Sequence, residues 1–393
     1  MRISDAERRR RLADRHHLRR GAAGGLEAVR GVAAFHSSDP VTPYLGLRAR
    51  VAGFDAGHLD RLIGEDRALW RLHAMRRTLF LVPTDHAAIF LGACSLPVAR
   101  KERRRLEKWL ARVMDPEDVP SWMEEVSARV VEVLEDGGEW RTQELAEVIP
   151  ELARRIELGA GKWATTAPVS SRLLLLLAME GQILRTHPAG SWRSSQYRWA
   201  ATSRWWDEPP RPMEDEAAAR AELVRLYLSG HGPATMTDLR WWTGWTLRQV
   251  RTALAGIAAA TVELDSGDQG YILADDHQVG AGTDGPVVAF LPGLDPTPMG
   301  WKERSWYIAT GTDQLFDSSG NVGPTVWADG RVVGGWGQLP DGKVVYELVE
   351  TVATDTRLRI ADEAEELGRW LDGEVVSVRF RTPLERKLAR QGT

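Results

Sequence analysis

The strongest constraint on the fold is an element order that recurs along the chain, in which helices are followed by a β-hairpin. Residues 5–20, 25–36 and 55–66 have the composition and spacing of helices, and the segment that ends in LFLVP at Pro83 has the pattern of a strand. Helices followed by strands are the order of a winged helix, a helix-turn-helix with a β-wing. The sequence therefore predicts a first winged helix over residues 1–118.

The same order returns twice, at a spacing on the order of 80–100 residues. Residues 119–207 contain an apolar helix at 168–180, followed by two strands around the turn HPAG, and residues 214–280 contain helices followed by a hairpin. The proline-rich segment at 208–213 is the best candidate for a linker. These patterns predict a second and a third winged helix, over 119–207 and 214–280.

The last third of the chain has a different pattern. A C-terminal domain is expected over residues 284–393. Residues 286–350 are rich in Gly, Pro, Val and Trp, and the pairs Asp329-Gly330 and Asp341-Gly342 are hairpin signals between β-rich runs. A helix, DEAEELGRWLDG, and a final strand, VVSVRF, are expected to follow. The predicted fold class is α+β, with three tandem winged-helix units and a C-terminal β-barrel-like domain.

The composition excludes several classes of protein. The 393 residues can bury a large core, and the hydrophobic content of 43% argues against a disordered chain. The longest apolar run, seven residues from Leu173, is too short to span a membrane, and the charged first residues do not resemble a signal peptide. The single cysteine, Cys94, excludes an internal disulfide. We therefore expect a cytoplasmic protein that needs no membrane and no cofactor.

The stretch FHSSDP, residues 35–40, carries the densest set of reactive groups. His36, Ser38 and Asp39 bring an imidazole, a hydroxyl and a carboxylate together before a proline. These groups are candidates for acid–base chemistry, but Ser38 or Asp39 can equally cap a helix by accepting hydrogen bonds from backbone amides. The sequence shows neither a phosphate-binding P-loop nor a dinucleotide fingerprint. His16 and His17 lack the usual spacing of metal ligands, so no metal site is expected.

Basic residues lie close to aromatic residues in several segments, which suits contact with phosphates and stacking on bases. The net charge of −4 does not exclude a basic channel offset by acidic outer faces. Asp295 and the block MGWKERSWY form a second polar concentration. A buried aromatic hairpin and a solvated loop remain alternatives for the segments at 192–199 and 299–307. The candidate DNA-binding residues are Arg76, Arg77, Arg193, Arg198, Lys302 and Arg304.

Several long motifs carry a resemblance to a known family. They are HSSDP followed by MRRTLFLVP, the block HGPATMTDLRWWTGW, and LPGLDPTPMGWKERSWY with GPTVWADGRVVGGW. With these motifs the chain resembles the AlkZ/YcaQ-like winged-helix DNA glycosylase superfamily. The resemblance implies three tandem winged helices, a C-terminal β-barrel and the removal of alkylated or bulky modified bases. The family's catalytic signature is Gln–aliphatic–Gln, or a variant with His first or Asp last. His36 fits the first position, Ser38 stands at the third, and Asp39 lies one residue later.

Our hypothesis from the sequence is a monofunctional DNA glycosylase, active as a monomer on double-stranded DNA that contains a modified base. His36 would orient or activate a water molecule with help from Ser38, and Asp39 would stabilise the positive charge on the sugar. The substrate could be an alkylpurine, an antibiotic adduct or a hypermodified phage base, reached by base flipping or by exposure of the strand. The alternative is a non-catalytic winged-helix DNA-binding protein, a regulator or damage sensor. A third possibility is a protein–protein scaffold.

Overall fold

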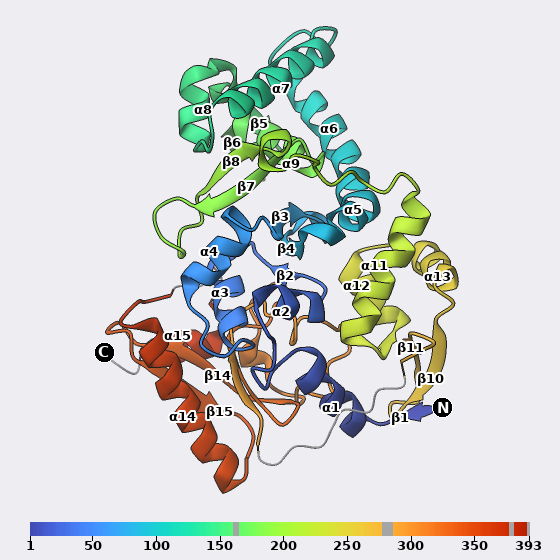
Figure 1. The fold of residues 1–393 in the computed structure, drawn as a ribbon, viewed down its shortest axis with the longest axis vertical. Coiled ribbons are helices and arrows are strands. Elements are labelled where there is room, and N and C mark those ends of the chain that lie inside the picture. Colours follow the sequence, from blue (N-terminus) through green and yellow to red (C-terminus); the bar gives the residue numbers. More distant parts are fainter. Residues whose placement is uncertain (160–164, 277–285, 377–380, 391–393) are drawn as a thin grey trace. The chain divides into compact units, whose positions relative to one another are not determined.

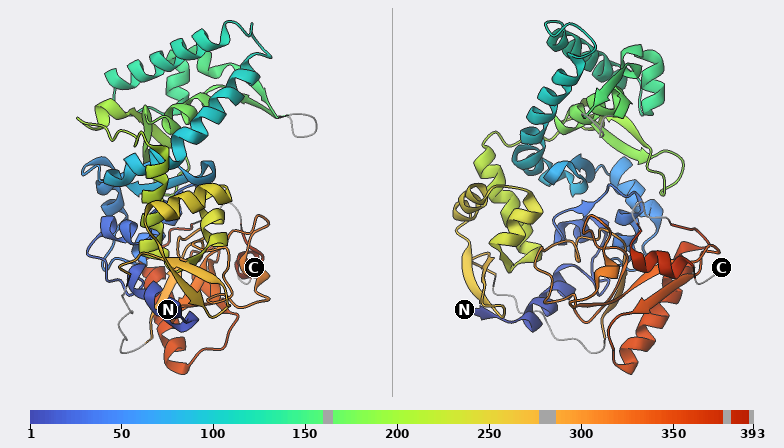
Figure 2. Two further views of the ribbon diagram at one scale, coloured as in Figure 1. Left: turned by 90° about the vertical axis from the view of Figure 1, so that its right-hand side faces the viewer. Right: turned by 180° about the vertical axis from the view of Figure 1, so that it is seen from behind.

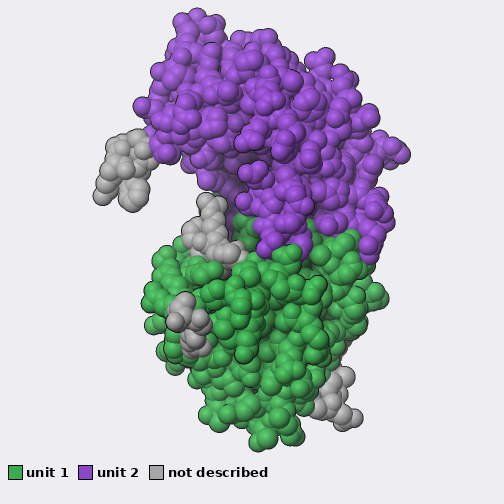
Figure 3. All heavy atoms as spheres, turned by 90° about the vertical axis from the view of Figure 1, so that its left-hand side faces the viewer, with its two compact units in different colours: residues 1–59, 221–393 green, residues 60–220 purple. Residues whose placement is uncertain are grey.

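The protein has a mixed α/β fold that divides into two compact units (Figure 3). Unit 1 combines residues 1–59 with 221–393, and unit 2 comprises residues 60–220. The structure is a computed structural model that describes residues 1–159, 165–276, 286–376 and 381–390. In these ranges, no helix is both long and apolar enough to cross a membrane.

Unit 1 contains helices from both ends of the chain and two small sheets (Figure 1). Its N-terminal elements are β1 (Arg2–Ile3), α1 (Asp5–Arg15), α2 (Gly25–Gly31), β2 (Phe35–His36), α3 (Val41–Arg48) and the start of α4 (Ala56–Gly64). Its later elements are most of α11 (Glu216–His231), β9 (Ala234–Thr235), α12 (Met236–Thr243), α13 (Leu247–Gly256), β10 (Ala260–Leu264), β11 (Gln269–Ile272), β12 (Val288–Leu291), η6 (Asp313–Leu315), β13 (Thr325–Ala328), β14 (Arg331–Gln338), β15 (Val344–Leu348), α14 (Thr354–Leu371) and α15 (Pro383–Ala389).

The two N-terminal helices are shorter than the sequence pattern indicates. Helix α1 ends at Arg15, and His17 and Arg20 have left-handed backbone conformations with φ of 52° and 55°. Helix α2 ends at Gly31, and Ala33 is also left-handed, with φ of 62°. Such conformations interrupt a right-handed helix. The prediction of one helix over 25–36 was therefore wrong, because Phe35 and His36 form the short strand β2.

The middle of unit 1 shows the expected local order of helices followed by a hairpin. Thr235 and Thr246 begin α12 and α13 with capping boxes, in which each threonine hydroxyl accepts a backbone N–H three residues later. Strands β10 and β11 then form an antiparallel pair that turns at Gly267, whose φ is 84°. The sheet has the order β1-β10-β11-β9. The assignment of three winged helices and of the segment boundaries stays a prediction.

The C-terminal strands form an open antiparallel sheet in the order β12-β13-β14-β15. Asp329 and Gly330, with φ of 50° and 84°, make the predicted tight turn between β13 and β14. The expected barrel-like domain needs correction, because within the described residues β12 and β15 are edge strands and the sheet does not close. Helix α14 lies along this sheet (Figure 2), where it contacts β12 and β15. Residues 377–380 of the predicted strand VVSVRF lie outside the described residues.

Unit 2 combines helices with the strand order β4-β3-β7-β8 and a separate pair, β5-β6. Its first elements are β3 (Leu69–His73), η1 (Met75–Arg77), β4 (Leu79–Pro83), η2 (Thr84–His86), α5 (Ala87–Phe90), the π-turn η3 (Leu91–Ser95) and α6 (Leu96–Leu110). The remaining elements are α7 (Val119–Asp136), α8 (Thr142–Val148), η4 (Pro150–Ala153), β5 (Arg155–Leu158), β6 (Thr165–Pro168), α9 (Ser170–Met179), β7 (Ile183–Pro188), β8 (Tyr197–Ala201) and α10 (Thr202–Trp205).

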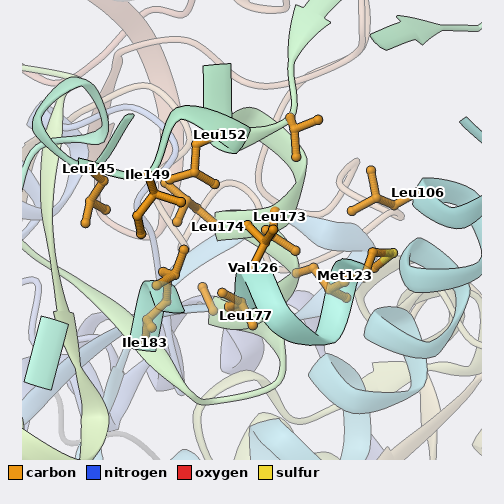
Figure 4. Packing of buried hydrophobic residues seen from close by; sticks show 14 of the residues in the cluster. Leu106, Met123, Val126, Leu145, Ile149, Leu152, Leu173, Leu174, Leu177 and Ile183 are labelled. Atoms are coloured by element: carbon orange, nitrogen blue, oxygen red, sulfur yellow. The ribbon is translucent and has the colours of Figure 1, made fainter. Parts of the chain in front are cut away.

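The core of unit 2 is built around the leucine-rich helix α9 (Figure 4). Leu173, Leu174 and Leu177 are at most 1% exposed and pack in one cluster with Met123 and Val126 of α7. Each buried leucine contributes about 1.5–3 kcal/mol through removal of its surface from water. This core holds β7 and β8 in place, because α9 runs directly into β7.

Candidate active site

The FHSSDP stretch connects strand β2 to helix α3. Ser37 is completely buried, Ser38 is exposed and Asp39 is only 7% exposed. The Asp39 carboxylate contacts the start of α3. Its Oδ1 accepts the Val41 N–H at a donor–acceptor distance of 3.4 Å. This bond is long for a hydrogen bond, so capping accounts for only part of the environment of the Asp39 carboxylate.

Ser38 and Asp39 line a cavity of about 90 Å³ inside unit 1. Two loops of the open sheet and helix α15 complete its wall. Residues 293–294 follow β12, and residues 317–324 precede β13. The wall consists of Ser38, Asp39, Gly293, Leu294, Asp317, Asn321, Val322, Gly323, Pro324 and Glu385. Three of these side chains, those of Asp39, Asp317 and Glu385, are acidic.

Glu385 is the acidic group whose titration departs most from normal. It lies in the first turn of α15, where its Oε2 accepts the Thr382 N–H at 2.9 Å and the Thr382 hydroxyl accepts the Glu385 N–H at 3.2 Å. Burial, with a further contribution from the negative charge of Asp39, raises the pKa of Glu385 to about 7. The two carboxyl groups therefore interact, and one of them can hold a proton near neutral pH.

Asp317 has a different environment from Asp39 and Glu385. Its Oδ1 accepts the backbone N–H of Ser319 at 2.8 Å and of Asn321 at 2.9 Å, while its Oδ2 accepts from the Asn321 amide at 2.9 Å. A carboxylate with three donors stabilises its own loop. Asp317 and Asn321 therefore shape the wall of the cavity.

A buried ion pair fixes the loop that carries Gly293 and Leu294. Arg50 and Asp295 are both fully buried, and their guanidinium and carboxylate groups meet at 2.7 and 2.9 Å in a bidentate pair. The Thr42 hydroxyl of α3 also donates to the Gly293 carbonyl at 2.8 Å. Asp295, singled out in the sequence as part of a polar concentration, thus holds the loop beside α3.

The structure brings two of the three predicted catalytic residues to one cavity. Ser38 and Asp39 lie in its wall, whereas His36, partly buried on β2, is not among the lining residues that the structure describes. Sequence reasoning missed Asp317 and Glu385. The only local signal at Glu385 is the capping-box pattern TPLE, which predicts the start of a helix and says nothing about a site.

Lys302 and Arg304, the predicted basic residues of unit 1, differ in role. Lys302 is exposed, and its backbone N–H donates to Asp238 at 2.8 Å. The Arg304 guanidinium lies 4.9 Å from the Trp241 ring and 5.4 Å from the Phe316 ring, and its Nε donates to a backbone carbonyl. Burial lowers the pKa of Arg304. These contacts tie Arg304 to its neighbours and leave Lys302 as the accessible cation of the block.

The other four basic residues belong to unit 2. Arg76 and Arg77 are exposed at the turn between β3 and β4, where both are left-handed with φ of 53° and 63°. Arg77 also donates to Glu102 at 2.9 Å. Arg193 is exposed in the connection between β7 and β8, and Arg198 on β8 lies 3.9 Å from a Glu144 carboxylate oxygen. Three of the four are thus available to solvent.

Within the described ranges, no group of three or more His, Cys, Asp or Glu side chains is arranged to hold a metal ion.

Comparison with known proteins identifies the family to which the chain belongs. The family model described as "DNA glycosylase AlkZ-like" matches residues 29–370, so the chain belongs to the AlkZ-like DNA glycosylase family and is a DNA glycosylase by class. Among solved structures, it is similar to the DNA glycosylase AlkZ of Streptomyces sahachiroi. The TM-score is 0.70 at 19% identity, and the match covers 98% of this chain and 99% of that one. No curated protein matches the chain in sequence.

Proposed function

We propose that this DNA glycosylase is monofunctional, and that it hydrolyses the N-glycosidic bond of a modified base in double-stranded DNA at the cavity beside Asp39. The observation that carries the proposal is the position of Ser38 and Asp39. These residues belong to the stretch that corresponds to the family's catalytic signature, and they line a cavity with a second carboxyl group, Glu385. Hydrolysis leaves a free base and an abasic site.

The chemistry needs a water molecule and stabilisation of positive charge. As the glycosidic bond breaks, the sugar becomes an oxocarbenium-like cation, which the Asp39 carboxylate can stabilise electrostatically. The cavity of about 90 Å³ accommodates a few water molecules, each of which occupies about 30 Å³ in the liquid. It is too small to enclose a nucleotide. We therefore assign to it the attacking water, with Ser38 as a hydrogen-bond partner of that water.

His36 enters this scheme through the family signature, whose first position it fits. It precedes Ser38 by two residues on the same segment. A role for its imidazole in orienting the water stays a prediction, since the cavity wall does not include it. Glu385 is better placed to exchange a proton with the water, because its pKa of about 7 suits general acid–base catalysis at neutral pH.

The absence of lysine from the cavity wall supports a water nucleophile. Bifunctional glycosylases use an amine to form a Schiff base with the sugar. No lysine lines the cavity among the residues described, and Lys387, two residues after Glu385, is paired with Glu347 at 2.7 Å. Lys162 lies outside the described residues. Reaction by way of an enzyme amine would therefore require a different site.

Lys302, Arg76 and Arg193 are the exposed cations through which we propose that duplex DNA is bound, with Arg77 and Arg198 in support. Phosphate contacts of this kind position DNA without reading its sequence. Arg304, the sixth predicted residue, would contribute to DNA binding indirectly. Its guanidinium packs against the Trp241 ring and so holds the segment that carries Lys302. The proposed substrate is DNA that carries an alkylated or bulky adduct or a hypermodified phage base, and its removal would serve DNA repair or phage defence.

Base release from DNA that carries an alkylated base tests the proposal, with alkali-induced strand breaks as the measure of abasic sites. Asp39→Asn should reduce the rate about 100-fold or more, as loss of charge stabilisation does elsewhere, and leave duplex affinity nearly unchanged. Asp362→Asn, an exposed acidic residue on α14, is the matched control. Full activity of Asp39→Asn would overturn the assignment. Borohydride should trap no covalent adduct, and a trapped adduct would contradict the water mechanism.

The second candidate is a DNA-binding protein without catalysis, and one observation favours it. Ser37 and Ser38 stand where the signature has an aliphatic residue and Gln or Asp. A DNA-binding protein without catalysis is expected to bind modified duplexes tightly and to release no base from any of them. The same assay separates the two, because binding without base release on a panel of modified DNAs supports the second candidate alone.

A further inference from the structure

Two arginines meet in the sheet of unit 2, away from the residues assigned to catalysis. Arg71 on β3 and Arg185 on β7 are paired opposite each other in the antiparallel register. Their guanidinium carbons lie 5.0 and 5.7 Å from the centroid of the Tyr197 ring, and that of Arg185 lies 4.9 Å from the Trp199 ring. Two positively charged guanidinium groups thus lie against the same aromatic ring, that of Tyr197.

Neither arginine forms an ion pair among the residues that the structure describes. Arg71 is only 2% exposed and donates one hydrogen bond, of 2.7 Å, to the Thr186 carbonyl. Its Nε and a second terminal nitrogen have no hydrogen-bond partner there. Arg185 makes no hydrogen bond within the described residues. Burial, reinforced by the charge of Arg71, lowers the pKa of Arg185 to about 10, so Arg185 remains a cation at neutral pH.

Such an arrangement is costly, because buried charges in proteins are almost always paired or bound to an ion. A cavity of about 330 Å³ opens beside Arg185. Its wall consists of Arg141, Thr142, Gln143, Arg185, Ser195, Gln196, Tyr197 and Trp199. The other cation of the wall, Arg141, is already paired with Glu144 at 2.7 Å. No aspartate or glutamate lines it. The wall therefore offers hydrogen-bond donors, aromatic surface and an uncompensated cation.

We propose that this cavity is a binding site for the phosphate group of a nucleotide, with Arg185 as its principal ligand and Arg71 as a second positive charge. A guanidinium binds phosphate oxygens through two parallel N–H bonds, and side-chain amides and hydroxyls can complete the shell. A phosphate monoester carries a charge of about −1.5 to −2 near pH 7, and a phosphodiester of the DNA backbone carries a charge of about −1. Either group supplies negative charge and acceptor oxygens to the two cations. The proposal does not depend on the catalytic assignment of Asp39.

The cavity is larger than a phosphate group alone, and its volume lies at the lower end of small-molecule sites, about 300–1,000 Å³. The remaining space suits the sugar to which the phosphate is attached. Two sources share this chemistry: a phosphate of the DNA backbone and a free mononucleotide. Both would bring the counter-charge that Arg71 and Arg185 lack.

Isothermal titration and thermal melting with inorganic phosphate, with 2′-deoxyadenosine 5′-monophosphate and with an unmodified DNA duplex test the proposal, against sodium chloride of equal ionic strength. Phosphate should raise the melting temperature of the full chain saturably. Arg185→Gln should weaken phosphate binding at least about tenfold, as loss of a charge-assisted hydrogen bond does. Arg155→Gln, on strand β5 and outside the cavity, is the matched control and should bind phosphate like the parent protein.

Gln143→Glu keeps the test decisive if Arg185→Gln fails to fold. This nearly isosteric change at the exposed edge of the cavity supplies the missing negative charge. It should raise the melting temperature without phosphate and weaken phosphate binding. A parent protein with no saturable response beyond that to chloride would overturn the proposal, as would an Arg185→Gln or Gln143→Glu variant that binds phosphate like the parent.

The two sources give different patterns, and both support the site. If DNA backbone is the ligand, Arg185→Gln weakens duplex binding and phosphate competes with the duplex. If a mononucleotide is the ligand, the deoxynucleotide binds more tightly than inorganic phosphate and duplex affinity is unchanged. Base release is not a readout here, so failure of this site and failure of the proposed glycosylase mechanism are distinguishable.

Discussion

Replacement of Glu385 by glutamine should make unit 1 more stable at alkaline pH and leave it nearly unchanged at acidic pH. Glu385 is 7% exposed, and burial together with the charge of Asp39 raises its pKa from 4.5 to about 7. Between these two values the folded protein holds a proton that the unfolded chain has lost. Stability therefore falls as the pH rises from 4.5 to 7, and the full cost is present above pH 7.

The size of the effect follows from the two pKa values. The difference between 4.5 and about 7, at about 1.4 kcal/mol for each pKa unit, corresponds to roughly 3.5 kcal/mol. Glutamine cannot ionise, but its carbonyl oxygen can still accept the Thr382 N–H that Glu385 Oε2 accepts at 2.9 Å. The advantage of the Glu385→Gln variant over the parent should therefore grow by about this amount between pH 5 and pH 8.

Thermal melts followed by tryptophan fluorescence at several pH values measure this difference. Glu365→Gln, an exposed position on α14, is the matched control and should follow the parent at every pH. Asp39→Asn should move the midpoint of the parent's pH dependence to lower pH, because it removes the negative charge that contributes to the raised pKa. Parallel pH profiles for the parent and Glu385→Gln would refute the raised pKa of Glu385. An unchanged midpoint in Asp39→Asn would refute the interaction of the two carboxyl groups.

Three further predictions concern other parts of the chain. Lys302→Glu should weaken binding to duplexes of any sequence and reduce the slope of log affinity against log salt by about one, and an unchanged slope would remove Lys302 from the DNA contact. The hydrogen bond from His187 to Glu139 raises the pKa of His187, so this pair stabilises unit 2 below pH 6.5 and loses its effect as the pH rises through the raised value. Glu139→Gln should return the His187 pKa, followed by NMR, toward its ordinary value. Thr246→Ala, which removes the capping box of α13, should cost about 1 kcal/mol in denaturant unfolding, whereas the conservative Thr246→Ser should cost much less.

Much of the local structure could be predicted because it depends on contacts between near neighbours in the chain. The Asp329-Gly330 turn and the Thr235 cap need only residues that are a few positions apart. The family resemblance has the same character, since it depends on contiguous motifs that keep their order along the chain, and the family match over residues 29–370 confirms it. Left-handed residues such as Ala33 escaped prediction, because no local signal marks a non-glycine residue for that conformation.

The helix caps, the hairpin turns and the stretch that holds Ser38 and Asp39 can be predicted from the amino-acid sequence, because each depends on adjacent residues. The folded chain was needed to show that Glu385, from the other end of the sequence, lies in the same cavity as Asp39 and interacts with its charge. It alone placed Arg71 opposite Arg185. The burial of apolar surface fixes the sheet register and the helix packing. Sheet register and helix packing can therefore bring together charged residues that lie far apart along the chain.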